Sequence, residues 1–381
     1  MEAQKGDGAR VQAGGIHGSL GRFRVLGVPV RLHFTLLLLL VFVLFVGFGE
    51  RQSVAINVID AVAVVLSLFL HELGHGLVCR RRGIRILEAV IFPVGGVWQL
   101  ERQPQPREEF WLSVAGPALN LLTAGLLIGF LAYSGAVLPL ERLTELTPFS
   151  LIQRIAMMNL LLGGVNLLPA FPMDGGRILR SLLALRRPHH EATRIAAATG
   201  QWLAIGLGLY GMLSTNFLLI FVAFFVYLGA AQESAVATGR HLTEGKAVRA
   251  AMVTDFRTLA HGQSIRDAAN LLLATAQQDF PVLHAGRVVG LLSRMALLKA
   301  LAGEGPDAYV ASAMDRDYLR LSPDEDLSRL FPAALRSGAC ALVMEGDELL
   351  GLLTAENLSE FLLLRRFGME PDRSASNPPA G

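Results

Sequence analysis

Two histidines and a glutamate stand together in the string His71-Glu72-Leu73-Gly74-His75, at the end of a long apolar run. On a helix, residues four apart lie on one face, so His71 and His75 present ring nitrogens to a single metal ion. Glu72 lies at the edge of that face, where its carboxylate accepts a proton from the attacking water. The spacing is therefore typical of a zinc-dependent hydrolase. The plainer interpretation is a helix end wetted at the membrane interface, just before Arg80.

A third candidate ligand lies in the segment "NLLPAFPMDGGR" at residues 166–177. Pro169 and Pro172 interrupt a helix there, and the glycine pair at 175–176 permits backbone conformations closed to other residues. We therefore expect Asp174 to lie on a bent segment that turns its carboxylate towards the metal. The alternative is an ordinary loop that ends a helix.

The composition predicts a membrane protein. Of 381 residues, 52% are hydrophobic and only 17% are charged, and the mean hydropathy is +0.46, which is too apolar for a soluble protein. The net charge of +2 gives no indication of nucleic acid binding. Six apolar runs indicate about six transmembrane helices: His33–Gly49, Ala55–Cys79, Phe110–Ser134, Ile155–Pro169, Ile195–Leu213 and Asn216–Ala231. Of these, the fourth and sixth are short for a span.

The basic residues predict the orientation. Arginine and lysine cluster before the first run and after the second, fourth and sixth, and these positions share one side if there are six spans. The protein is then expected to span the plasma membrane several times, with both termini in the cytoplasm. The second and fourth spans end on that side, so His71, His75 and Asp174 are expected at similar depth. Each ionisable group at membrane depth costs about 2.5 kcal/mol or more, so their convergence calls for a function.

The C-terminal part reads as a soluble α/β region with an internal repeat. "AMVTDFRTL" from Ala251 aligns with "AMDRDYLRL" from Ala313, and "GRVVGLLSRMALL" from Gly286 aligns with "GDELLGLLTAENL" from Gly346. The period is about sixty residues.

Cysteine chemistry adds little, since the only two cysteines, Cys79 and Cys340, stand in regions of different character and are expected to be reduced thiols.

Together these motifs resemble the site-2 protease family of intramembrane zinc metalloproteases, in its bacterial and archaeal branch, followed by a tandem CBS pair. The resemblance implies that His71, His75 and Asp174 bind one zinc ion and that Glu72 is the catalytic base. The substrate is then a transmembrane or membrane-associated protein, unwound locally at the site. The implied domains are 1–22 disordered, 23–232 protease, 233–247 linker, 248–304 and 308–365 CBS repeats, and 366–381 disordered tail.

Two further segments fit the protease resemblance. "AGPALN" at 115–120 opens the third span, and Asn120 is a candidate for binding an oxyanion or the substrate backbone; helix packing through the small residues is the alternative. "IFPVGGVWQLE" at 91–101 predicts a β-hairpin whose edge pairs with substrate, which makes Gly95 and Gly96 candidate substrate residues. Asn166 is a third substrate or oxyanion candidate.

By resemblance, CBS pairs bind adenine nucleotides such as ATP or AMP, with the ribose held by a polar residue three positions after Ser or Thr. The second repeat has Thr354 with Asn357, whereas the first has Ser293 with Ala296. The pair is therefore expected to be a nucleotide-responsive regulator or, alternatively, a structural module that forms a homodimer.

Two other functions fit parts of the sequence. CBS pairs also follow transporters and channels, which distribute polar groups along a midplane path and are often built from two repeated halves. Here the polar groups concentrate at one end in a metal-ligand pattern. A catalytically silent family member is the second alternative, and the presence of all four site residues argues against it.

Overall fold

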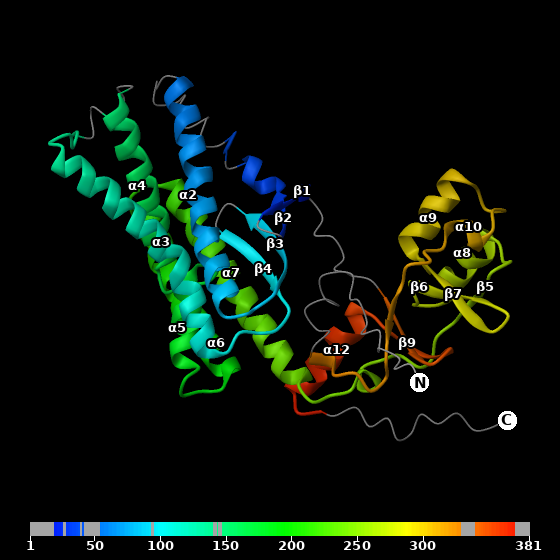
Figure 1. Cartoon of the computed structure of the whole chain (residues 1–381). Coiled ribbons are helices and arrows are strands. Elements are labelled where there is room, and N and C mark those ends of the chain that lie inside the picture. Colours follow the sequence, from blue (N-terminus) through cyan, green and yellow to red (C-terminus); the bar gives the residue numbers. More distant parts are fainter. Residues whose placement is uncertain are drawn as a thin grey trace, which may run out of the picture. The chain divides into compact units, whose positions relative to one another are not determined.

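The computed structural model describes residues 19–25, 28–38, 40–41, 54–92, 95–139, 143, 147–328 and 340–369. The described residues divide into two compact units, with the boundary between residues 237 and 238. We call the described residues from 19 to 237 the membrane unit and those from 238 the CBS unit (Figure 1).

Four helices are long and apolar enough to cross a membrane among the described residues: α2 (Val54–Arg81), α3 (Pro106–Tyr133), α4 (Pro148–Asn166) and α7 (Phe217–Thr243). They correspond to the second, third, fourth and sixth predicted spans. The fifth predicted span forms α6 (His189–Leu213), which is not among those four. The first begins as helix at residues 34–38 and 40–41, and the rest of it lies outside the described residues.

Helices α2, α3 and α4 pack against one another as a three-helix group (Figure 1). At 1.5 Å per residue, the 28 residues of α2 extend about 42 Å, more than the roughly 30 Å of a bilayer's hydrocarbon core. The outward faces are apolar, with Leu66, Leu122 and Leu126 each more than half exposed. Such surfaces suit lipid contact and would be unfavourable in water.

A four-stranded sheet lies beside α2 in the order β1-β2-β3-β4. Its strands are β1 (Ser19–Val25), β2 (Val28–His33), β3 (Ile86–Phe92) and β4 (Gly95–Leu100). Strands β3 and β4 form the predicted hairpin, and β2 runs parallel to β3. The prediction that residues 1–22 are disordered was wrong for 19–22, which belong to β1; antiparallel pairing with β2, which begins at Val28, orders this segment. Residues 1–18 lie outside the described residues.

A compact turn between two helices, packed against α6 and α7, holds Asp174 in place. Helix α4 ends at Asn166, and α5 (Asp174–Leu183) begins after a compact turn. In that turn Phe171 is fully buried against alanines of α6 and α7, and Met173 packs with Ala204 and Val226. Helices α6 and α7 therefore support the turn from which α5 starts.

The CBS unit contains both predicted repeats. The first has β5 (Leu259–Ala260), α8 (Ile265–Ala274), β6 (Asp279–His284), β7 (Arg287–Ser293) and α9 (Arg294–Gly303). The second has β8 (Leu319–Leu321), β9 (Ala341–Glu345), β10 (Glu348–Leu353) and α12 (Ala355–Arg366), after the short α10 (Val310–Ala313). Residues 329–339, between β8 and β9, are not described.

Each repeat folds as a three-stranded sheet, in the orders β5-β6-β7 and β10-β9-β8. A shared apolar cluster joins the sheets, with Val288 and Leu291 of β7 beside Leu342 of β9 and Leu352 of β10. Helix α7 continues to Thr243, through most of the segment predicted as a linker.

Both cysteines are free and buried. Burial, with Asp279 nearby, raises the pKa of the Cys340 thiol to about 12. This thiol is therefore protonated at neutral pH and belongs to the apolar core.

Candidate metal centre

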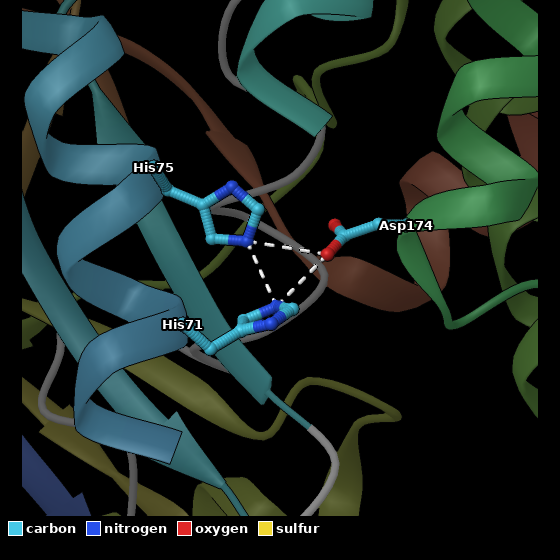
Figure 2. A group of neighbouring side chains, drawn as sticks. All are labelled: His71, His75 and Asp174. Carbon is cyan, nitrogen blue, oxygen red and sulfur yellow. Dashed lines mark hydrogen bonds and ion pairs between the residues drawn. The ribbon is translucent and has the colours of Figure 1, made fainter. Parts of the chain in front are cut away.

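Three side chains from two helices converge at one point (Figure 2). His71 and His75 project from the same face of α2, and Asp174 is the first residue of α5. The Nε2 atoms of the histidines are 3.0 Å apart, and Asp174 Oδ2 is 3.0 Å from that of His71 and 3.2 Å from that of His75. All three residues are buried.

These separations match the edges of a metal coordination polyhedron. With bonds of about 2.0–2.1 Å, two ligands of a tetrahedral zinc ion lie about 3.3 Å apart. Two imidazole nitrogens and a carboxylate oxygen are also the ligand types that zinc prefers, with a fourth position left for water. The residues present therefore fit a zinc ion.

The remaining ring nitrogens fix the tautomers of both histidines. His75 Nδ1 donates to the Leu112 carbonyl at 2.7 Å, and His71 Nδ1 donates to Asn120 Oδ1 at 3.1 Å. With the proton on Nδ1, each Nε2 has a free lone pair directed at the shared point. This is how proteins orient metal-binding histidines.

Asn120 extends this arrangement into the helix group. Its Nδ2 donates to the Ser67 carbonyl at 3.1 Å and to Asn159 Oδ1 at 2.9 Å, and Asn159 Nδ2 donates to Ser67 Oγ at 2.9 Å. Both amide protons of Asn120 are thus bound to protein atoms. This leaves no donor for the oxyanion role predicted for Asn120, whose side chain instead orients His71.

Glu72 lies under the hairpin. Gly96 N–H donates to Glu72 Oε1 at 2.5 Å, and the indole Nε1 of Trp98 donates to Glu72 Oε2 at 2.6 Å. A methyl carbon at Gly96 would approach Glu72 Oε2 to 2.3 Å, so only glycine permits this contact. Strand β4 therefore holds both oxygens of the carboxylate.

The helix backbones approach closely at the site. A methyl carbon at Gly116 would lie 2.5 Å from His75 Nε2 and 2.8 Å from His71 Cε1. Gly116 of α3 thus leaves room for the two imidazoles, which agrees with the packing interpretation of the "AGPALN" segment.

The other sequence candidates lie elsewhere. Asn166 Nδ2 donates to the Leu162 carbonyl of its own helix α4, and Gly95 begins β4 opposite Phe92. In the CBS unit Thr354 Oγ1 accepts from Asn357 N–H and donates to Asn357 Oδ1, so the pair caps α12; Ser293 caps α9 in the same way.

A cavity of about 180 Å³ adjoins the metal centre. Its wall includes His75, Trp98, Asp174, Arg177 and Arg180. Arg180 is fixed there by Glu109 of α3, at 2.9 Å from Nε, and by Glu233 of α7, at 3.3 Å from Nη1. The cavity provides space for water beside the converging ligands.

Sequence reasoning did not identify Trp98, Ser67 or Asn159. For Ser67 and Asn159 a signal existed, because polar residues inside apolar spans usually have a functional or structural partner. Trp98 carried no such signal, because an aromatic residue in a strand is ordinarily a packing residue.

Comparisons with known proteins agree with this geometry. The model of peptidase family M50 matches residues 59–149 and 135–207, and the CBS domain model matches residues 248–303. The zinc metalloprotease MJ0392 of Methanocaldococcus jannaschii is 28% identical over 344 residues, which cover 89% of this chain and 95% of that protein. Rip3 of Mycobacterium tuberculosis is 29% identical over 340 residues, which cover 84% of each chain.

Among solved structures, the site-2 protease from Methanocaldococcus jannaschii is 35% identical, with 57% of this chain and 95% of that chain covered and a TM-score of 0.46. Family model, relatives and domain order agree with one another. The chain belongs to peptidase family M50, the site-2 protease family of zinc metalloproteases, and carries a C-terminal CBS pair.

Proposed function

We propose that this protein is an intramembrane zinc metalloendopeptidase that cleaves a transmembrane or membrane-associated protein, with His71, His75 and Asp174 as the zinc ligands. The observation that carries the proposal is the convergence of three ligand atoms 3.0–3.2 Å apart, with both Nδ1 positions already hydrogen-bonded. A zinc ion bound there would supply Lewis acidity to the scissile carbonyl and to a water molecule.

Glu72 is the general base. It takes a proton from the attacking water and returns it to the amine that leaves, so no net charge change is required of the enzyme. Gly96 and Trp98 keep its carboxylate on the hairpin side of α2. Each carboxylate oxygen retains a lone pair for this transfer, since it accepts one hydrogen bond and can accept two.

Strand β4 is the proposed docking edge for substrate. It is the terminal strand in the order β1-β2-β3-β4, so no other strand covers its outer edge among the described residues. An unwound substrate segment adding to that edge would bring its carbonyls next to Glu72. Gly95 and Gly96 keep this end of the edge free of bulky side chains.

In the proposed topology the protein spans the plasma membrane several times and both termini lie in the cytoplasm. Arg80 and Arg81 end α2, and Arg240 follows the apolar part of α7, which supports this orientation by the positive-inside rule. The metal centre then lies near the cytoplasmic side of the membrane, and so does the cut. The CBS pair, residues 248–304 and 308–365, is cytoplasmic.

For the CBS pair we propose a regulatory role through an adenine nucleotide, ATP or AMP, near Thr354 and Asn357. The cap made by these two residues leaves Asn357 Nδ2 for a ligand hydroxyl. Homodimerisation through the pair without a nucleotide is the alternative, and equilibrium binding of ATP and AMP distinguishes the two.

Two substitutions test the protease proposal. Glu72→Gln should reduce cleavage by about 10²–10⁴-fold while the zinc content stays equal to the parent's. The substrate is found first, as a membrane protein that accumulates uncut in cells expressing Glu72→Gln. Asp174→Ala should lower the zinc content itself, measured by elemental analysis of the purified protein.

Glu101→Gln is the matched control, because Glu101 is an exposed acidic residue beyond the end of β4. It should change neither zinc content nor cleavage. Undiminished cleavage by Glu72→Gln would remove Glu72 from the mechanism, and parental zinc content in Asp174→Ala would remove Asp174 from the centre.

A further inference from the structure

A second cavity, of about 340 Å³, lies in the CBS unit. It is lined by His261 after β5, His284 at the end of β6, Val288 and Val289 of β7, and Arg320 of β8. The segment that leads into β8 adds Met314, Arg316 and Tyr318. This segment is fixed along β7 by the hydrogen bonds between Leu291 and Asp315, 2.8 and 2.9 Å long. The wall is thus built from three strands and a pinned connection.

The lining carries positive charge and no carboxylate. Arg316 and Arg320 are both present, and His261 and His284 lie with ring centroids 5.1 Å apart. Asp315 and Asp317 flank Arg316 in sequence but do not line the cavity. Among the described residues Arg316 makes no ion pair within 4.0 Å. Converging cations of this kind attract an anion from solution.

Arg320 is held in position by its neighbours. Its guanidinium lies 5.0 Å from the ring centroid of Tyr318, and its Nη2 donates to the Tyr318 hydroxyl at 2.6 Å. That hydroxyl donates in turn to the Val288 carbonyl at 3.1 Å. An arginine held in this way loses less conformational entropy when it binds a ligand.

This cavity is separate from the position of Thr354 and Asn357. Strands β5 and β6 run parallel, so His261 and His284 follow the same end of the sheet, next to the β6–β7 turn. Ser293, the first-repeat equivalent of Thr354, lies at the opposite end of β7. At that opposite end Asp279 begins β6, and burial together with Glu356 raises the pKa of its carboxyl. One end of the sheet is therefore basic and the other acidic.

We propose that the basic cavity binds an oligophosphate, either inorganic or the phosphate tail of a nucleotide, with Arg316 and Arg320 on the phosphate oxygens. Guanidinium groups bind phosphate through paired charge-assisted hydrogen bonds. The volume lies within the range of small-molecule sites, and Val288, Val289 and Met314 provide an apolar wall. His261 and His284 add donors at the rim.

The test is calorimetric titration of the purified full-length protein with inorganic pyrophosphate and, separately, with ADP. The parent should bind pyrophosphate saturably. Arg316→Gln and Arg320→Gln should each weaken binding by about tenfold to a hundredfold, the usual loss for a charge-assisted hydrogen bond. ADP is titrated into Thr354→Ala, so that the nucleotide position proposed at Thr354 does not contribute. ADP binding tighter than pyrophosphate there identifies a nucleotide as the ligand of the cavity, and equal or weaker ADP binding identifies the phosphates alone; both results support the site.

Two controls make the test specific. Arg287→Gln removes an exposed arginine of the same hairpin that pairs with Asp347 at 3.5 Å and does not line the cavity. Thr354→Ala removes the polar pair that caps α12 in the second repeat and does not line the cavity. Both variants should bind pyrophosphate with a Kd within threefold of the parent's. A change far from the cavity usually alters the binding free energy by no more than about 0.6 kcal/mol, which is a threefold change in Kd.

Three outcomes would overturn the proposal: no saturable binding by the parent, equal weakening by Arg287→Gln and Arg316→Gln, or loss of binding in Thr354→Ala. None of these measurements depends on peptidase activity. A failed oligophosphate site therefore leaves the protease proposal untouched.

Discussion

The membrane unit and the CBS unit differ in whether their arginines are paired with carboxylates. In the membrane unit Arg154 pairs with Asp60 and Arg180 pairs with Glu109, with every one of these side chains at most 14% exposed. In the basic cavity of the CBS unit, Arg316 and Arg320 face open space with no carboxylate in the lining. Charges at membrane depth must be compensated within the protein, because lipid provides no hydration.

The difference shows how charge compensation and the position of charged groups together identify a ligand site. A compensated pair at depth needs no partner from outside, so Arg154 and Asp60 are explained by the fold. An uncompensated group of cations in water costs little by itself, but its convergence on a cavity is unexplained until an anion is added. The metal centre combines both cases, because His71, His75 and Asp174 are buried like the pairs and converge like the cavity.

The largest expected effect comes from breaking the Arg154–Asp60 pair. Arg154 Nη1 is 2.7 Å from Oδ1 and 2.5 Å from Oδ2 of Asp60, and Arg154 Nε donates to the Leu143 carbonyl at 2.9 Å. Arg154→Met leaves a buried carboxylate without a partner and should destabilise the protein by about 3–5 kcal/mol. Thermal unfolding in detergent measures the loss.

The double variant Arg154→Met with Asp60→Leu should recover most of that stability, since no charge is then left unpaired. Arg102→Met is the control, because its pair with Glu108 has Arg102 at 47% exposure and should contribute less than about 1 kcal/mol. An equal loss in Arg154→Met and Arg102→Met would show that burial does not distinguish these pairs.

A smaller effect is expected at the metal centre from Asn120→Leu. The change removes the acceptor of His71 Nδ1–H and leaves His71, the metal ligand of the proposal, free to rotate. Loss of such an orienting group usually costs about 10–100-fold in metal affinity. Zinc affinity measured by competition with a chelator reports it directly.

Thr123→Val serves as the matched control for Asn120→Leu, because Thr123 lies one turn further along α3. Among the described residues its hydroxyl bonds only the Leu119 carbonyl of that helix. If Asn120→Leu kept the parental zinc affinity, the network from Ser67 and Asn159 to His71 would have no part in holding the metal.

The smallest effect is expected at Asp279, at the end of the β5-β6-β7 sheet opposite the basic cavity. Burial and then Glu356 raise the pKa of Asp279 above its ordinary value of 3.8, so the folded unit holds this proton more tightly than the unfolded chain. Its stability contribution is present below pH 3.8 and is lost as the pH rises through the raised pKa. Asp279→Asn should therefore stabilise the CBS unit at pH 7.5, with a gain that shrinks towards pH 4.

Hydrogen exchange of the β6 and β7 amides, followed by mass spectrometry, isolates the CBS unit in the full chain. Asp267→Asn is the control, since its exposed carboxylate accepts from Ser264 and has a lowered pKa. Protection that drops in Asp279→Asn at pH 7.5 would contradict the conclusion that burial and Glu356 make the charged form of Asp279 unfavourable.

Local patterns predicted most of the metal centre. The four-residue spacing of His71 and His75 needed only a helix, and α2 provides it. The prediction of Asp174 as a ligand depended on topology, because the second and fourth spans had to end at the same depth in the membrane. The structure brings the three side chains together through the turn between α4 and α5, although the separate helix α5 was not predicted. The CBS repeat and the hairpin also followed from local signals.

Long-range pairing was out of reach of the sequence. Strand β2 pairs with β3 between residues about sixty positions apart, such as Val30 and Ala89, and the β1–β2 hairpin joins the sheet only through that pairing. The hydrogen bond from Trp98 to Glu72 joins residues 26 positions apart, and no periodicity indicates it. Such contacts depend on which elements pack together, which a single sequence leaves open.

Gly96 and Gly116 give a way to sort the relatives of this protein. A single added carbon at Gly96 would overlap Glu72, and one at Gly116 would overlap both histidines. Relatives that keep the HExxH string but carry a larger residue at either aligned position must displace the Glu72 carboxylate or the two imidazoles from the positions described here. The residues aligned with Gly96 and Gly116 therefore indicate which HExxH-containing relatives can hold their site side chains as this protein does, a distinction that the metal-binding motif alone does not make.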